Sequence, residues 1–381
     1  MDAMPQSLKE LYRKLQIHLD RMPVGFPATK SGIELKLLRY LFTPQQAEAA
    51  LHLSAVPEPV KRIQGRAGKS GLSAFDFREI LEEMAADGLI LKTVDSRGCP
   101  LYSKLPLAIG IYEMQVFRLT RELEELFLQY VKEAFGDAFL SRKTTQMRTI
   151  PVDIRLTADR NVVTYDDARG LVERAKGPFA VIDCICKKGQ ALRGKPCGQR
   201  DYREACLTLG SMAEKVLRSG RGKRLERREV GLLLDRADEE GLVVQPQNTR
   251  DPGFICFCCG CCCHVLRTAE RYPEPASFFS TNYFARVDPD LCIACGSCSS
   301  RCQMEAIFTD ETQTLVDLTR CIGCGLCVTA CPSEAIRLEK SPKTRIPPKD
   351  QNELYLRILK ERFGPTGTAK IAVKKVLGMK I

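Results

Sequence analysis

Eight cysteines near the carboxyl end of the chain recur at a spacing suited to metal binding. The first four follow the pattern C-x₂-C-x₂-C-x₃-C, and the second four repeat it 29 residues later. Matching Val-Asp and Glu-Ala-Ile segments flank both copies, so residues 284–339 form a duplicated unit. Three thiolates three residues apart can wrap a tight loop around the iron corners of a cubane, and nearby glycines let backbone N–H groups approach the cluster. The eight residues are Cys292, Cys295, Cys298 and Cys302, followed by Cys321, Cys324, Cys327 and Cys331.

This duplicated segment resembles the two-cluster bacterial-type ferredoxin domain. The resemblance implies two [4Fe–4S] clusters whose fourth ligands are exchanged between the two motifs. One cluster would be held by Cys292, Cys295, Cys298 and Cys331, and the other by Cys321, Cys324, Cys327 and Cys302. Gln303 stands where proline usually follows the fourth cysteine, which removes a rigid turn but no ligand. Zinc, the alternative metal, is typical of two C-x₂₋₄-C pairs and fits the doubled pattern less well.

Ten further cysteines lie in the middle of the chain, in two groups. Neighbouring cysteines cannot form unstrained disulfides, and a reducing compartment would not preserve them. We therefore expect the two groups to meet in space and to share at least one metal centre, with an iron–sulfur cluster preferred, zinc second and a catalytic dithiol third. The Cys258-Cys259-Gly260 triplet resembles the CCG element of heterodisulfide-reductase-type subunits. The first group is Cys184, Cys186, Cys197 and Cys206; the second is Cys256, Cys258, Cys259, Cys261, Cys262 and Cys263.

The elements that must position these cysteines indicate an α+β multidomain protein. Residues 1–136 contain helical periodicities and then a hairpin near 89–102, and the order of elements in residues 32–112 resembles a winged helix-turn-helix domain. A long helix is expected over 113–135. Residues 148–266 are predicted to form a small α/β domain, with strands at 150–156 and 179–182 and helices at 166–175, 201–217 and 229–240. The ferredoxin-like domain spans 284–339, and a basic tail with one short helix spans 340–381.

Charge does not favour specific DNA binding. The chain has 58 basic and 47 acidic residues, a formal net charge of +11. The tail contributes +8 of this, from 11 basic and 3 acidic residues. The helix expected at residues 73–86, which would read DNA in a winged-helix domain, has four acidic residues and one basic residue. Because DNA binding needs several cations on one face, we expect this domain to dock proteins instead.

Composition limits the remaining function classes. The hydrophobic fraction is 44%, without an uncharged apolar run of membrane-spanning length or an apolar N-terminal segment typical of a secretory signal. Metal-binding thiolates favour a reducing, cytoplasmic location. We therefore expect an electron-transfer protein of anaerobic metabolism that serves a redox partner or an oxidoreductase complex, because the layout resembles large ferredoxin-type proteins of anaerobic bacteria. A redox-sensing transcriptional regulator and an oxidoreductase subunit with an extra catalytic cluster are the alternatives. The oligomeric state is left open.

Overall fold

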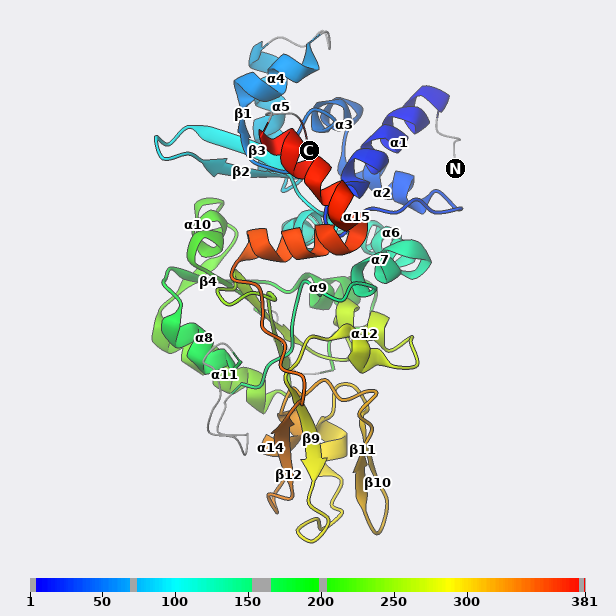
Figure 1. Ribbon diagram of the computed structural model, residues 1–381, viewed down its shortest axis with the longest axis vertical. Helices are drawn as coiled ribbons and strands as arrows, with labels where there is room; N and C mark the ends of the chain where they lie inside the picture. Colours follow the sequence, from blue (N-terminus) through cyan, green and yellow to red (C-terminus); the bar gives the residue numbers. More distant parts are fainter. Residues whose placement is uncertain (1–4, 69–73, 153–165, 199–203, 377–379, 381) are drawn as a thin grey trace. The chain divides into compact units, whose positions relative to one another are not determined.

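The computed structural model divides the chain into two compact units (Figure 1). Unit 1 comprises residues 1–142 and 355–381, and unit 2 comprises residues 143–354. The structure describes residues 5–68, 74–152, 166–198, 204–376 and 380. No helix within these ranges is long and apolar enough to cross a membrane.

Unit 1 contains a helical layer and a three-stranded antiparallel sheet of order β1-β3-β2. Its α3 begins with a capping box, in which the Thr43 hydroxyl accepts from the Gln46 amide and the Gln46 side chain accepts from Thr43. The hairpin expected near residues 89–102 is present as β2 and β3. The elements are α1 (Gln6–Asp20), α2 (Ile33–Leu41), α3 (Pro44–Ala50), β1 (Glu58–Pro59), α4 (Val60–Ala67), α5 (Ala74–Ala86), β2 (Ile90–Val94) and β3 (Pro100–Lys104).

The long helix expected over residues 113–135 is interrupted once, between Phe117 and Arg121, and its second part runs on beyond Phe135. A 3₁₀ turn, η2 (Glu113–Phe117), ends before Thr120, whose side chain accepts from the Leu123 amide and starts a new helix. An N-cap side chain accepts a hydrogen bond from a backbone amide that would otherwise pair within a continuous helix. The cap at Thr120 therefore favours a new helix that begins at the next residue. After this start, helical backbone is continuous through α6 (Arg121–Tyr130), the π-helical turn η3 (Val131–Phe135) and α7 (Gly136–Leu140). A separate element, η1 (Leu107–Ile111), precedes η2.

The C-terminal tail is more structured than the sequence indicates. Instead of one short helix, α15 (Gln351–Val376) continues across a kink at Gly364, where φ is 68°. Within unit 1, the Arg362 guanidinium forms a 2.8 Å ion pair with Asp20 and donates to the Met22 carbonyl. Lys380 donates to the Leu51 carbonyl at 2.6 Å. These contacts hold α15 and Lys380 against the N-terminal part of unit 1.

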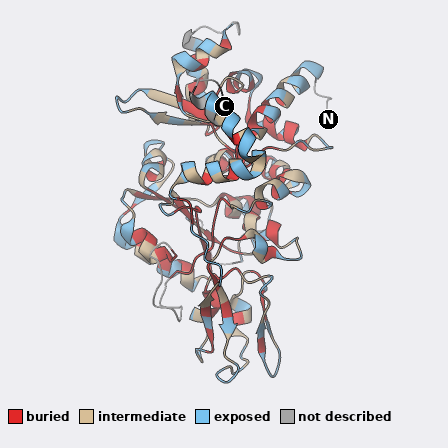
Figure 2. Ribbon diagram, in the orientation of Figure 1, coloured by how far each residue is buried: buried red, intermediate tan, exposed pale blue. Residues whose placement is uncertain are grey.

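Unit 2 is built on a five-stranded sheet of order β6-β4-β5-β8-β7. Every strand pair in it is antiparallel, which corrects the expected α/β class of this region to α+β. Buried residues run along its central strands (Figure 2). The strands are β4 (Phe179–Ile182), β5 (Cys206–Leu209), β6 (Lys223–Leu225), β7 (Val243–Pro246) and β8 (Phe254–Cys258), and the helices are α8 (Ala168–Arg174), α9 (Ile185–Leu192), α10 (Gly210–Arg218), α11 (Arg227–Glu239) and α12 (His264–Ala269).

The helix expected over residues 201–217 is wrong before Gly210, where residues 201–203 lie outside the described part of the chain. Residues 206–209 form β5, and only α10 is helical, because Gly210 (φ 53°) ends the strand and begins the helix. This difference matters for the cysteines, since Cys206 now lies in the sheet directly opposite Cys256 on β8. The strand expected at 150–156 lies mostly outside the described residues, although Ile150 bridges to Val244.

The duplicated segment contains two antiparallel strand pairs, one formed by its first and last strands and one formed by a hairpin between them. β9 (Tyr283–Val287) pairs antiparallel with β12 (Ile336–Lys340), and β10 (Ile307–Thr309) pairs with β11 (Thr314–Val316). Two short helices complete the segment, α13 (Ser297–Arg301) and α14 (Leu326–Thr329). Each helix contains the third cysteine of its motif, Cys298 in α13 and Cys327 in α14, so the duplication seen in the sequence is repeated in the fold.

A buried lysine makes the stability of unit 1 depend on pH. Lys104, at the end of β3, is 4% exposed, and its Nζ donates to the His18 carbonyl at 3.2 Å. Burial, together with the charges of Lys380 and Arg21, lowers the pKa of Lys104 to about 7. In the unfolded chain a lysine titrates near pH 10.4. Between these values the unfolded state binds more protons, so stability rises with pH across this window.

We predict that Lys104→Met raises the stability of the protein at pH 7 by about 1–4 kcal/mol and abolishes the extra gain between pH 7 and 10. The measurement is urea unfolding at several pH values, followed by far-UV circular dichroism. Lys61→Met removes the same charge from an exposed position and should leave the pH profile unchanged. Parallel profiles for wild type and Lys104→Met would contradict this account.

Candidate metal centres

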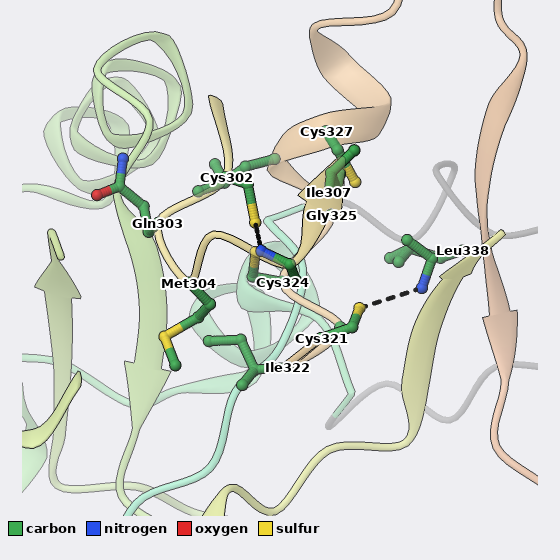
Figure 3. Close-up of a pocket in the computed structure, with 14 residues that line it drawn as sticks. Cys302, Gln303, Met304, Ile307, Cys321, Ile322, Cys324, Gly325, Cys327 and Leu338 are labelled. Carbon is green, nitrogen blue, oxygen red and sulfur yellow. Dashed lines mark hydrogen bonds between the residues drawn. The ribbon is translucent and has the colours of Figure 1, made fainter. Parts of the chain in front are cut away.

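Four cysteines from both copies of the duplicated motif line one cavity (Figure 3). Cys302 follows α13 in the first copy, whereas Cys321, Cys324 and Cys327 belong to the second copy. Apolar side chains, including Met304 and Leu338, line the rest of the cavity. The structure therefore brings the fourth cysteine of the first motif to the first three cysteines of the second.

Backbone amides point at the sulfur atoms of this cavity. The Ala306 amide donates to the Cys302 Sγ at 3.2 Å, and the Ala285 amide donates to the Cys321 Sγ at 3.4 Å (dashed lines in Figure 3). Burial raises the pKa of Cys324 to about 12, so metal binding has to displace a proton there. Four convergent sulfurs with N–H donors and an apolar wall are a donor set that suits a [4Fe–4S] cluster.

The other four cysteines of the repeat lie in a more open environment. The charge of Cys331 acts on Cys295 and Cys298, which places the fourth cysteine of the second motif beside the first motif. Cys295 is exposed, and a hydrogen bond with Ser297 lowers the pKa of its thiol. Cys292 contacts the Thr314 hydroxyl at 3.4 Å. The two groups of four cysteines thus differ in exposure, and solvent exposure is one of the factors that set a cluster's reduction potential.

One glycine in the second cysteine loop has no space for a side chain. Gly323 has a φ of 64°, and a Cβ there would lie 2.1 Å from the Tyr283 carbonyl oxygen. Its counterpart in the first copy is Ala294, which has a φ of 50°. The backbone of the second loop therefore passes against β9 more closely than any side chain allows.

We predict that Gly323→Ala disrupts the cavity formed by Cys302, Cys321, Cys324 and Cys327, and that iron content falls by about four atoms per chain. The reason is the clash with the Tyr283 backbone, which cannot move without breaking the pairing of β9. Iron and acid-labile sulfide would be measured after anaerobic reconstitution. The reciprocal change Ala294→Gly is the matched control and should retain full iron content; equal loss in both variants would contradict the argument.

The ten middle cysteines separate into two sets. In the first, which we call the tetrathiol set, all four sulfurs lie within 4.8 Å of one another. Cys197 Sγ lies 3.6 Å from Cys259 Sγ and 3.7 Å from Cys261 Sγ. Cys261 Sγ lies 3.4 Å from Cys259 Sγ and 3.6 Å from Cys262 Sγ. The two groups seen in the sequence therefore meet in space through Cys197.

The remaining six cysteines, which we call the six-thiol set, follow one another as a series of side-chain contacts. Cys186 contacts both Cys184 and Cys263, and Cys263 also contacts Cys258. Cys258 contacts Cys256, which in turn contacts Cys206. The strand register explains the last contact, because Cys206 and Cys256 are directly paired. The set is therefore Cys184, Cys186, Cys263, Cys258, Cys256 and Cys206.

The middle sheet and the duplicated segment are joined beside Cys302. The Gly260 amide donates to Gln303 Oε1 at 2.7 Å, and a Cβ at Gly260 would lie 2.6 Å from the Gln303 carbonyl oxygen. Arg301 donates to the Glu239 carbonyl at 2.9 Å. The residue that replaces the usual proline after the fourth cysteine is thus a contact to the turn that carries the tetrathiol set. Sequence reasoning noted Gln303 but gave it no role, because its partner is 43 residues away.

Comparison with known proteins agrees with the duplicated segment. A family model described as a 4Fe-4S dicluster domain matches residues 285–338. Comparisons of the chain with curated proteins and with solved structures give no match. The match supports an iron–sulfur domain at this end of the chain, and the mixed helical and sheet architecture agrees with the α+β class.

Proposed function

We propose that the protein transfers electrons through two [4Fe–4S] clusters in the duplicated segment. One cluster would be held by Cys321, Cys324, Cys327 and Cys302, and the other by Cys292, Cys295, Cys298 and Cys331. The single observation that carries this proposal is the cavity in which Cys302 joins three cysteines of the other motif. A [4Fe–4S] cluster supplies one-electron chemistry, and the protein contributes hydrogen bonds, burial and access.

The more exposed site is the one through which we expect electrons to be exchanged with a partner protein. Large apolar side chains near Cys295 in the sequence are exposed to solvent, with Leu291 52% and Ile293 65% exposed. Phe308 and Leu315 on the neighbouring hairpin are also more than half exposed. Apolar side chains around an exposed redox site suit a redox partner or an oxidoreductase complex. With nineteen cysteines, we place this role in the reducing cytoplasm and in anaerobic metabolism.

The exchange of ligands can be tested with paired substitutions. If Cys302 and Cys321 belong to one cluster, Cys302→Ala/Cys321→Ala should lose about four iron atoms per chain and leave the second [4Fe–4S] cluster intact. The reduced protein should then show the electron paramagnetic resonance spectrum of one isolated cluster, without magnetic coupling.

The matched variant is Cys321→Ala/Cys331→Ala, which removes one ligand from each proposed cluster. It should damage both clusters. If this variant keeps one intact cluster while Cys302→Ala/Cys321→Ala damages both, each cluster is held by its own motif and the proposed ligand exchange is wrong.

The six-thiol set favours a second candidate function, that of an oxidoreductase subunit with a further centre in unit 2. Each of these six thiols contacts at least one other inside the protein. Cysteine is a reactive residue, and so many neighbouring thiols are unusual unless a metal ion replaces their protons. Cys263 accepts hydrogen bonds from the Val265 and Leu266 amides, as an anionic sulfur would. A third iron–sulfur centre at this position would extend the relay inward from Cys302.

For unit 1 we propose a winged-helix-like domain that docks a protein. Its order of helices and its β1-β3-β2 sheet agree with that layout. On α5, Glu82 contacts Tyr102 and forms a 2.6 Å ion pair with Lys92 of the hairpin, and the helix keeps its excess of acidic residues. An acidic helix in this position repels a phosphate backbone and suits a basic protein surface.

We therefore predict weak, sequence-independent DNA binding that disappears as salt is raised from about 50 to 200 mM. The measurement is a gel-shift titration of the full protein with random and genomic duplexes. Arg78→Ala removes the single cation of α5 and should not change the affinity. A specific site that survives moderate salt and is lost in Arg78→Ala would instead support the transcriptional regulator.

A further inference from the structure

The tetrathiol set is the cluster of chemically reactive side chains that the proposed electron relay does not use. Its sulfurs come from two separate parts of unit 2. Cys197 lies on the segment after α9, and the other three lie in the turn between β8 and α12. Within this turn the Cys263 amide donates to the Cys259 carbonyl at 3.0 Å, so the backbone closes a tight loop beneath the sulfurs.

The turn is fixed by side chains from outside it. The Gln190 amide group of α9 donates to the Cys261 carbonyl at 3.1 Å, and the Gly260 amide donates to Gln303. These contacts hold the backbone on both sides of the sulfurs. The turn therefore holds the thiols of Cys259, Cys261 and Cys262 in fixed positions, facing Cys197.

The separations between the sulfurs match a single metal ion. In a tetrahedral thiolate site with metal–sulfur bonds of about 2.3 Å, neighbouring sulfurs stand about 3.8 Å apart. Four of the Sγ–Sγ separations in the structure are 3.4, 3.6, 3.6 and 3.7 Å. In a [4Fe–4S] cluster each thiolate binds a different iron corner, so the sulfurs would have to be farther apart than the edge of one tetrahedron.

Charge also fits a metal ion. Lys187 on α9 is 5% exposed, and its positive charge acts on Cys259. Four thiolates around a divalent ion carry a net charge of about −2. The positive charge of Lys187 lies close enough to offset part of it.

We propose that Cys197, Cys259, Cys261 and Cys262 bind one thiophilic divalent metal ion in a tetrahedral, all-thiolate site. Zinc and iron both favour four thiolates in this geometry. The site is distinct from the two proposed clusters of the duplicated segment and shares no ligand with the six-thiol set. Metal binding at this site would fix the position of the turn that contacts Gln303, the residue next to Cys302.

The test uses the full chain, purified anaerobically. Wild type should contain about one zinc per chain or, in the iron form, one iron beyond the clusters, with a single shell of four sulfurs near 2.3 Å in X-ray absorption. The two metals are distinguished by elemental analysis and by the high-spin ferric resonance of an oxidised iron tetrathiolate. Cys197→Ala and Cys261→Ala should each lose this metal while the cluster signals of the duplicated segment remain.

Cys99→Ala, at an exposed cysteine outside both sets, and Cys206→Ala, in the six-thiol set, are the controls and should retain the mononuclear metal. Because a variant can fail to fold, Co²⁺ added to metal-depleted wild type gives a second measurement, and it should show the absorption bands of a tetrahedral tetrathiolate. A zinc–iron distance at the zinc absorption edge, retention of the metal in both ligand variants, or a disulfide involving Cys197 would each overturn the proposal. None of these outcomes bears on the duplicated segment.

Discussion

Contact between thiols is the constraint on which unit 2 depends. The antiparallel register of β5 and β8 sets Cys206 opposite Cys256. In the turn that follows β8, Cys259, Cys261 and Cys262 join the tetrathiol set, whereas Cys263 contacts the six-thiol set. Buried sulfurs at this density are stable only as thiols that hydrogen-bond to each other or as thiolates neutralised by metal. The sheet order, the tight turn and the positions of α9 and α12 all serve to bring these sulfurs together.

Contacts between the duplicated segment and the middle sheet connect the tetrathiol set to the loop of Cys302. Gln303 joins the loop of Cys302 to the turn of the tetrathiol set through a hydrogen bond and a close backbone approach. Arg301 and Thr329 add contacts from the two short helices to the end of α11, at Glu239 and Asp238. The inner side of the duplicated segment is therefore fixed to the middle sheet, while the loop with Cys295 and Ile293 stays open. In the proposed relay, the site of Cys302 would therefore be the inner end, and the site of Cys295 would be the outer end.

The sequence allowed local features to be predicted well and long-range ones poorly. The capped start of α3, strand β4 and the doubled cysteine motif follow from short-range chemistry, so they could be predicted directly. The segment around Cys206 was taken for a helix, because its strand character comes from pairing with β8 and not from its own residues. The meeting of the two middle cysteine groups was predicted, but their division into four and six depends on the turn at Gly260. The extent of α15 was also missed, because contacts such as Arg362 with Asp20 span the whole chain.

The order of the sulfurs along the chain sets an order of assembly during synthesis. The last sulfur of the tetrathiol set is Cys262, so that site can close before the ribosome has finished translating the duplicated segment. The cavity around Cys302 stays incomplete until Cys327 has emerged, and the four sulfurs around Cys295 wait for Cys331. If the proposed sites are occupied, a nascent chain would bind the mononuclear metal first and receive the two proposed clusters almost together at the end. Premature termination anywhere before Cys327 would leave neither cluster complete, so truncated products would lack both.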